Sequence, residues 1–214
     1  MKYKVITCVT SYNRYEYLKR FVSTWKSTVS DDFENILIIA DDNSTDFTKK
    51  YLDKIKSKNI LVINNNRVGI SRQTNSLFGM CSNLGFNYAF KCDDDIWFKK
   101  PGWQQLYINA IKKTGYEHLC YHNNKWHRPK RDSVSDGPII AETSVLDCMG
   151  CFWTFTPNVL NKVGLFDQNN FGFMGHEHID FSMRCCRAGF NDRVNFFDAK
   201  SSNDFIDMVG RKEE

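Results

Sequence analysis

Three consecutive carboxylates, Asp93, Asp94 and Asp95, are the residues of this chain whose types and spacing most directly suggest chemistry. They follow Phe86–Lys91, an apolar run with alternating aromatic residues, which predicts a buried strand ending at the carboxylates. Adjacent anions repel one another, so an ordered site needs a positive partner, most simply a hard divalent cation such as Mn²⁺ or Mg²⁺. The alternative is a solvated acidic turn, which an isolated carboxylate run usually is.

Two more polar motifs follow earlier predicted strands. Residues 10–14 read Thr-Ser-Tyr-Asn-Arg, so small hydroxyls, the aromatic face of Tyr12 and the cation of Arg14 stand at a helix start. That combination suits a nucleobase and a pyrophosphate. Residues 41–46 include Asp42, whose carboxylate can accept hydrogen bonds from a base or ribose. The same Asp-Asn-Ser-Thr run is equally an ordinary helix cap.

A third motif, residues 66–75, combines a glycine with a cation near a predicted helix start. Gly69 permits a tight turn there, and Arg72 is predicted to reach a phosphate. In open α/β sheets, ligands bind at the carboxyl ends of strands. The four motifs are therefore predicted to meet around one ligand.

The elements that position these motifs alternate in type through the first half of the chain. Strands are predicted at Lys4–Val9, Asn35–Ala40, Ile60–Ile63 and Phe86–Lys91, and helices at Tyr15–Thr28, from a cap at Ser44 through Ile55, and at Ser71–Cys81. Such alternation predicts βαβ units, hence an α/β fold whose central sheet is mostly parallel with helices on both faces.

The second half changes character. A helix is predicted at Trp103–Lys113, shorter strands near Glu117–Tyr121 and within Ile139–Phe155, a glycine-bearing loop at Asp167–Gly175 and a last helix at Ile179–Ala188. At 214 residues the chain suits one large domain. We therefore expect a single domain over 1–214, with different roles for 1–100 and 101–214.

Composition excludes several protein classes. The chain is 42% hydrophobic and 25% charged with a net charge of +4, which is ordinary for a globular protein. Its apolar runs are too short to cross a membrane, and strand-like sequence from Tyr3 leaves no room for a signal peptide. The eight cysteines are scattered, so we expect reduced core residues and a cytoplasmic protein. Cys148 and Cys151 form a lone CxxC, which does not predict a zinc site.

Taken together, the motifs resemble those of the family 2 glycosyltransferases, which have the Rossmann-like nucleotide-sugar-binding fold called GT-A. The resemblance extends from Val5 to about Phe197, and its pieces are TSYNR, DDNSTD, the segment 66–75, CDDDIWF and GHEHIDFSMRCCRAGF. It implies a mostly parallel central sheet, a smaller acceptor-side sheet and a nucleoside-diphosphate sugar, UDP- or GDP-linked, as donor.

The resemblance also implies roles for the motif residues. Thr10, Tyr12 and Asp42 would flank the base and ribose, with Arg14 and Arg72 near the phosphates. Asp93 and Asp95 would hold Mn²⁺ or Mg²⁺ as a DxD motif, with Asp94 beside the donor. In another register, Cys92 takes the first acidic place and Asp94 becomes the main ligand. A third ligand would come from Asp198, Asn203, Asp204 or water.

The last motif departs from the family pattern of an acidic pair. Glu177, Asp180, Arg184 and Gly189 match it, but His178 occupies the place of the usual catalytic aspartate. We expect His178 to be the base of an inverting transfer, oriented by Glu177 or Asp180, because a neutral imidazole accepts protons near neutral pH. Alternatively, His178 only packs and Asp180 or Glu177 is the base. A retaining mechanism needs no such base.

The sequence predicts the acceptor and its binding residues less specifically than the donor site. Residues 121–131 interleave cations and aromatics, which suits nucleic acid, although a solvated hairpin explains them equally. The acceptor is thus a glycan, a protein or a modified base of DNA. Trp97, Trp126 and Trp153 could stack on sugars or pack in the core. The alternatives to transfer are a metal-dependent nucleotidyltransferase and a nucleotide-sugar-binding module that lost its base.

Overall fold

The computed structural model describes residues 2–123, 134–144, 149–192 and 195–209. The helices are α1 (Tyr15–Thr28), α2 (Phe47–Ile55), α3 (Ile70–Leu84), α4 (Trp103–Thr114), α5 (Pro157–Val163) and α6 (Glu177–Arg187), with a 3₁₀ turn at Ser202–Asp204. The strands are β1 (Lys4–Ser11), β2 (Glu34–Asp41), β3 (Ile60–Asn64), β4 (Tyr88–Asp93), β5 (Ile96–Phe98), β6 (Val134–Asp136), β7 (Ile139–Ser144), β8 (Phe152–Phe155), β9 (Asn195–Ala199) and β10 (Ile206–Met208).

A five-stranded sheet in the order β3-β2-β1-β4-β8 forms the centre of the molecule. Its first four strands are parallel and β8 runs antiparallel to β4. Two small antiparallel sheets, β6-β7-β9 and β10-β5, come from the later part of the chain. The predicted α/β class and its mostly parallel sheet are therefore confirmed.

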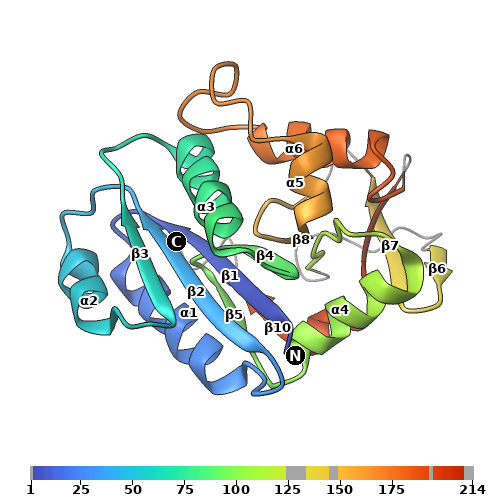
Figure 1. Cartoon of the computed structure of the whole chain (residues 1–214), viewed down its shortest axis with the longest axis horizontal. Helices are drawn as coiled ribbons and strands as arrows, with labels where there is room; N and C mark the ends of the chain where they lie inside the picture. Colours follow the sequence, from blue (N-terminus) through green and yellow to red (C-terminus); the bar gives the residue numbers. More distant parts are fainter. Residues whose placement is uncertain (1, 124–133, 145–148, 193–194, 210–214) are drawn as a thin grey trace.

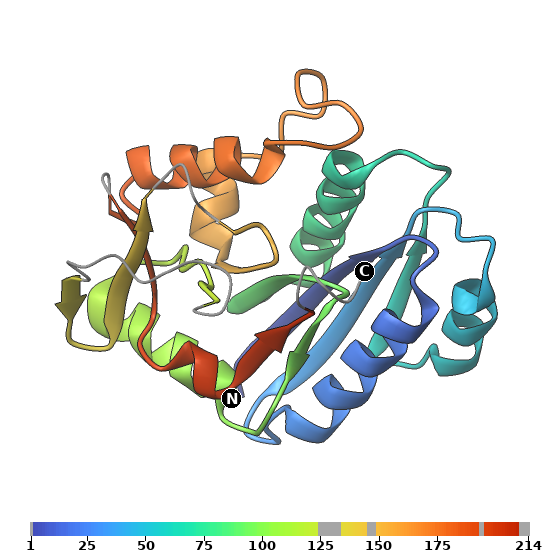
Figure 2. The ribbon, with the colours of Figure 1, turned by 180° about the vertical axis from the view of Figure 1, so that it is seen from behind.

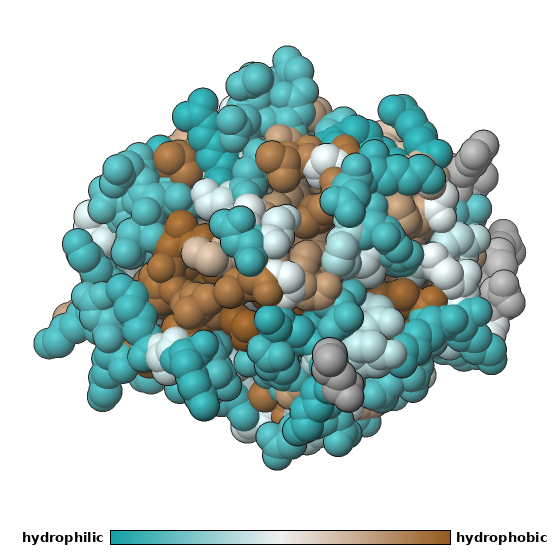
Figure 3. Space-filling view, viewed as in Figure 1, coloured by the Kyte–Doolittle hydropathy of each residue, from teal (hydrophilic) through white to brown (hydrophobic). Residues whose placement is uncertain are grey.

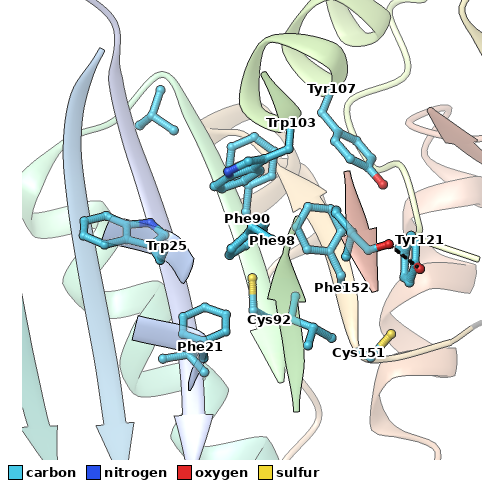
Figure 4. Packing of buried hydrophobic residues seen from close by; sticks show 14 of the residues in the cluster. Phe21, Trp25, Phe90, Cys92, Phe98, Trp103, Tyr107, Tyr121, Cys151 and Phe152 are labelled. Atoms are coloured by element: carbon cyan, nitrogen blue, oxygen red, sulfur yellow. Dashed lines mark hydrogen bonds between the residues drawn. The ribbon is translucent and has the colours of Figure 1, made fainter. Parts of the chain in front are cut away.

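Helices pack on both faces of this sheet. Helices α3, α5 and α6 lie on the face seen in Figure 1, and α1 lies on the face seen in Figure 2. Each face has its own apolar core, one with α1, α2 and α4 and the other with α3, α5 and α6. Figure 4 shows the first, where the rings of Phe98 and Trp103 stack with centroids 4.0 Å apart and Phe90 meets Trp103 edge-on.

Helix α1 has the predicted bounds. Its residues Leu18, Phe21, Val22 and Trp25 recur every three or four positions and are buried against the sheet. On the other face, one helix, α3, covers the β2–β3 side, and Figure 3 shows apolar side chains at this surface. Leu61 and Ile63 of β3 are accordingly only half-buried.

Three local predictions need correction. Asp46 rather than Ser44 caps α2, since its carboxylate accepts from the Thr48 amide at 2.9 Å, while Ser44 bonds Asp41. The last helix begins at Glu177, two residues earlier than predicted. Residues 117–121 form no continuous strand, because their amides bond separate segments at Phe190, Phe197 and Phe152.

The cysteine prediction is confirmed for the described residues. Cys8, Cys81, Cys92, Cys120, Cys151, Cys185 and Cys186 are buried thiols. Cys148, and with it the CxxC motif, lies outside the described residues. No helix in the described ranges is both long enough and apolar enough to cross a membrane.

A buried histidine on the α6 side predicts an acid-sensitive fold. His118 is fully buried, with Nδ1 3.0 Å from the Thr154 carbonyl and Nε2 2.8 Å from the Ser182 hydroxyl. Burial lowers its pKa from 6.5 to about 4, against an opposing contribution from the Thr154 hydrogen bond. Between these values the unfolded chain binds a proton that the folded chain excludes, so stability falls as pH falls.

We expect His118 alone to remove about 3 kcal/mol of stability as the pH drops from 6.5 to 4. Urea unfolding across this range measures the effect. The His118→Gln variant should be less stable at pH 7 but should lose less stability on acidification. Equal pH slopes for the two proteins would contradict the assignment.

Candidate active site

A pocket of about 390 Å³ lies at the carboxyl-terminal edge of the central sheet. Its lining combines ends of β1 and β4 with residues from α3, β8 and α6: Thr10, Ser11, Tyr12, Arg14, Ile70, Gln73, Lys91, Asp93, Asp94, Asp95, Gly150, Trp153, Phe166, Met174, Glu177 and His178. A larger hollow of about 1040 Å³ lies around the α1–β2 and α2–β3 connections, and none of the predicted site residues lines it. Most of the predicted site residues therefore border the smaller pocket.

Strand register explains which carboxylates face this pocket. Thr10 of β1 pairs with Asp93 of β4, and Lys91 of β4 pairs with Trp153 of β8. Side chains alternate along a strand, so Lys91 and Asp93 point to the same face of the sheet. Asp94, which follows the last residue of β4, also borders the pocket and accepts a hydrogen bond from Ser11 at 2.7 Å.

Two protein cations already compensate the three carboxylates. Lys91 ion-pairs with Asp93, and Arg14 lies 3.0 Å from Asp94 and 3.0 Å from Asp95. Burial raises the pKa of Asp94 to about 7, opposed by Arg14 and by the Ser11 hydrogen bond. The positive partners that the triplet needs therefore include two side chains of the fold itself, Arg14 and Lys91.

The carboxylates nevertheless fit a divalent cation. Oδ1 of Asp95 is buried and has no hydrogen-bond partner among the described residues. A hard cation such as Mn²⁺ or Mg²⁺ is bound by oxygens of this kind. Within the described ranges, no three His, Cys, Asp or Glu side chains are arranged to hold a metal together. Such a cation would complete its shell with diphosphate oxygens and water.

The residues predicted for the third metal position lie elsewhere. Asp198 is buried, where it accepts hydrogen bonds from Tyr107 and Ser202. Asn203 contacts Tyr121 and the carbonyl of His122. Neither they nor Asp204 border the pocket.

The predicted base-binding residues are only partly brought together. Thr10 and Tyr12 border the pocket, and the guanidinium of Arg67 lies 3.4 Å from the centroid of the Tyr12 ring. Asp42 is fully buried just behind, where it accepts hydrogen bonds from the Val68 amide at 2.7 Å and the Gly69 amide at 3.0 Å. It thereby fixes the turn that precedes α3.

Arg72 does not join the site. It is exposed on α3 and does not border the pocket, whereas Gln73, the next residue, does. A helix turns by about 100° per residue, so adjacent side chains face different directions. The position of Arg72 near the helix start could be predicted, but its direction could not.

The segment before α6 brings Glu177 and His178 into the pocket. Glu177 accepts from the Gly175 amide at 2.7 Å and lies 3.5 Å from Nδ1 of His178. Burial works to raise the pKa of Glu177, but hydrogen bonds from His178 and the backbone lower it to about 2, so it is ionised. An ionised carboxylate beside an imidazole orients the ring and stabilises its protonated form.

Asp180 does not border the pocket. Its carboxylate binds Arg184 at 2.8 Å, and Arg184 also donates to the carbonyls of Val163 and Leu165. Arg184 thus ties α6 to the end of α5. The arrangement gives Asp180 a structural partner, one turn away on its own helix.

Several pocket residues were not predicted. Lys91 could have been found, because a lysine inside a predicted buried strand requires an anionic partner. Ser11 belongs to the motif at 10–14, whereas Gln73 and Gly150 carried no comparable signal, since their roles depend on which elements meet. The segment 124–133, which contains Trp126 and the basic run, lies outside the described residues.

Gly150 sets the position of the histidine ring. A Cβ at this residue would lie 2.7 Å from Cγ of His178, closer than any real contact. We therefore expect Gly150→Ala to displace the ring and lower turnover by about tenfold to a hundredfold, with donor affinity nearly unchanged. Steady-state kinetics and donor titration measure the two effects separately.

Gly79→Ala is the matched control, because nothing lies within 4 Å of a Cβ there. It lies within α3, where alanine should raise stability by about 0.5–1 kcal/mol without changing turnover. Wild-type turnover in Gly150→Ala would show that the ring position is not critical.

Comparison with known proteins places these features in a class. The solved structures that share this fold are GT-A glycosyltransferases. GalNAc-T7 with UDP, GalNAc and Mn²⁺ superposes with a TM-score of 0.70 at 13% identity, over 92% of this chain and 42% of that one. PcManGT, a mannosyltransferase from Pyrobaculum calidifontis in complex with GDP-Man and Mn²⁺, gives 0.64 at 12% identity, over 92% and 57%. TarS 1–349 of S. aureus gives 0.61 at 17% identity, over 85% and 55%. The chain therefore has the GT-A fold.

The chain belongs to glycosyl transferase family 2, whose pattern it matches over residues 7–164. It is also 27% identical over 176 residues to a protein of Acanthamoeba polyphaga mimivirus described as the uncharacterized glycosyltransferase R363. That match covers 81% of this chain and 66% of the relative, so the chain spans slightly less than two thirds of the relative's length.

Proposed function

We propose that this chain is a metal-dependent glycosyltransferase that moves a sugar from a nucleoside diphosphate to an acceptor hydroxyl with inversion. One observation carries the proposal: the Asp93–Asp95 carboxylates and the Glu177–His178 pair border the same pocket. Transfer needs these two groups together, one at the leaving diphosphate and one at the acceptor. The relatives solved with UDP or GDP-Man and Mn²⁺ support a UDP- or GDP-linked donor.

The order of motifs along the sheet edge fits an extended donor. Tyr12 follows β1, the carboxylates follow β4, and Gly150 precedes β8, which is the next strand across. A nucleotide sugar laid across this edge would place its base near Tyr12, its diphosphate at Asp93 and Asp95, and its sugar beside β8. Asp93 and Asp95 would hold Mn²⁺ or Mg²⁺, which when bound neutralises charge on the departing diphosphate.

His178 is the proposed base. With the proton on Nδ1, which faces Glu177 Oε1, the lone pair of the neutral ring is on Nε2. The acceptor hydroxyl gives its proton to that nitrogen while its oxygen forms a bond to the anomeric carbon. The bond from that carbon to the phosphate oxygen breaks, and its electron pair leaves with the diphosphate. Glu177 acts through His178 as a positioning residue, and Asp180 positions α6 through Arg184.

The test is turnover of radiolabelled UDP-glucose, UDP-N-acetylgalactosamine and GDP-mannose with and without Mn²⁺. Glycan, protein and hydroxymethylated DNA acceptors are supplied in separate reactions. Metal-dependent release of UDP or GDP together with a labelled acceptor supports the proposal. Tight donor binding without transfer or hydrolysis would support the binding-module alternative instead, and release of pyrophosphate from a nucleoside triphosphate would indicate a nucleotidyltransferase.

A further inference from the structure

Besides Oδ1 of Asp95, two uncharged buried polar atoms at the pocket have no hydrogen-bond partner among the described residues. They are Oε1 of Gln73, on the first turn of α3, and Nε1 of Trp153, on β8. Gln73 is 5% exposed and Trp153 is 0% exposed. Among the described residues neither side chain donates or accepts through these atoms, although native proteins satisfy the great majority of buried polar groups.

Aromatic packing positions the Trp153 ring, and the start of α3 positions the backbone of Gln73. The Trp153 ring lies between Phe78, Phe166 and Phe181, with centroid distances of 6.0, 6.0 and 5.2 Å. Gln73 lies at the start of α3, where its backbone N–H donates to the Gly69 carbonyl. The backbone N–H of Ile70 donates to the carbonyl of Phe173 at 2.9 Å. The aromatic neighbours of Trp153 and the backbone bonds around Gln73 thus fix both residues beside the pocket.

The two atoms together match a hydroxyl-bearing ligand. An indole N–H only donates and a carbonyl oxygen only accepts, whereas a hydroxyl group does both. Trp153 is the cross-strand neighbour of Lys91 on β4, two residues before Asp93. The unsatisfied pair therefore borders the pocket on the side where the donor sugar is proposed to lie, beyond the diphosphate.

The charges around the pocket favour a neutral sugar. Four carboxylates border it, at Asp93, Asp94, Asp95 and Glu177, and the two cations among the described lining residues, Arg14 and Lys91, are already ion-paired with three of them. A divalent metal and the diphosphate of a nucleotide sugar carry equal and opposite charges. The lining carboxylates would therefore repel a carboxylate on the sugar, and Arg14 and Lys91 already bind other carboxylates.

Building on the proposed function, we propose that Gln73 and Trp153 bind hydroxyl groups of the donor sugar and select a neutral sugar over a uronic acid. Gln73 Oε1 accepts from one hydroxyl and Trp153 Nε1 donates to the same or a neighbouring one. Binding satisfies two groups that otherwise stay buried without partners, so the sugar adds affinity beyond that of the nucleotide diphosphate.

Isothermal titration calorimetry with Mn²⁺ tests this, using UDP-glucose, UDP-N-acetylgalactosamine, GDP-mannose, UDP-glucuronic acid, UDP and GDP as probes. Wild-type protein should bind at least one neutral nucleotide sugar more tightly than its free diphosphate, and UDP-glucuronic acid more weakly than UDP-glucose. Gln73→Leu and Trp153→Phe should each weaken that sugar's binding by about three- to tenfold, the range of one hydrogen bond, with UDP or GDP affinity unchanged.

Gln105→Leu is the matched control, because this exposed residue lies outside the pocket lining. Circular dichroism checks that each variant is folded. If Trp153→Phe does not fold, Gln73→Leu alone decides the outcome. Unchanged nucleotide-sugar affinity in a folded Gln73→Leu protein overturns the inference but leaves the proposed transferase standing. Wild-type protein that binds neither diphosphates nor their sugars overturns both.

Discussion

Replacing His178 by alanine is expected to lower the turnover number by about two to four orders of magnitude, the usual contribution of a general base. The acceptor hydroxyl is a weak nucleophile until its proton is removed, and His178 borders the pocket beside the ionised carboxylate of Glu177. Donor affinity should change little, because the base acts on the acceptor. Turnover of labelled donor and calorimetric titration with the nucleoside diphosphate measure the two quantities.

Other variants on the same helix separate the candidates for the base. Asp180→Asn removes the ion pair with Arg184. It should therefore lower the free energy of unfolding but have little effect on the turnover number. Glu177→Gln keeps the shape but removes the charge beside the ring. It should lower turnover less than His178→Ala and shift the acidic limb of the pH–rate profile to lower pH, because an imidazole without its anionic neighbour protonates less readily.

His176→Asn is the matched control for the histidine. His176 is exposed two residues away and has a left-handed backbone (φ 61°), which asparagine tolerates. It should keep wild-type turnover. Near-normal turnover in a folded His178→Ala protein, with a large loss in Asp180→Asn, would transfer the role of base to Asp180.

Replacing the two proposed metal ligands, Asp93 and Asp95, is the second large expected effect. In Asp95→Asn and Asp93→Asn, we expect turnover to fall by about three orders of magnitude or more, because the charge growing on the diphosphate loses its partner. Chelation by EDTA should abolish wild-type turnover, and added Mn²⁺ should restore it. Titrations with Mn²⁺ in the presence of UDP or GDP should show weakened binding in both variants.

These variants also distinguish metal binding from folding. Each removes one carboxylate from an ion pair, Asp93 with Lys91 or Asp95 with Arg14, so the partner cation loses its compensation. Thermal unfolding without metal reports that loss separately from the metal-dependent stabilisation.

Asp53→Asn, which replaces an exposed carboxylate on α2, makes the same charge change away from the site and should leave turnover and Mn²⁺ affinity unchanged. Full Mn²⁺-dependent activity in Asp95→Asn would refute the assigned metal position.

The sequence by itself determined the class of fold and the approximate place of the site. Alternating strand and helix patterns predicted the mostly parallel sheet, and the spacing of Leu18, Phe21, Val22 and Trp25 predicted α1 to the residue. The edge at which Thr10 and Asp93 meet also followed, because parallel strands place their carboxyl ends together. Periodicity and strand direction are local properties, so they can be read from neighbouring residues.

Only the tertiary structure decided which side chains face one another. The pairing of β4 with β8 brings Trp153 beside Lys91, 62 positions apart in the chain. The meeting of α6 with the Gly150 segment places a histidine ring where a single methyl group would collide with it. Arg72 was predicted at the phosphates and Gln73 was overlooked, although they are adjacent, because the direction of a helix face depends on the sheet against which it packs. Contacts between distant segments carry no local signature, and that is why the pairing of Arg14 with Asp94 and Asp95 emerged from the folded chain alone.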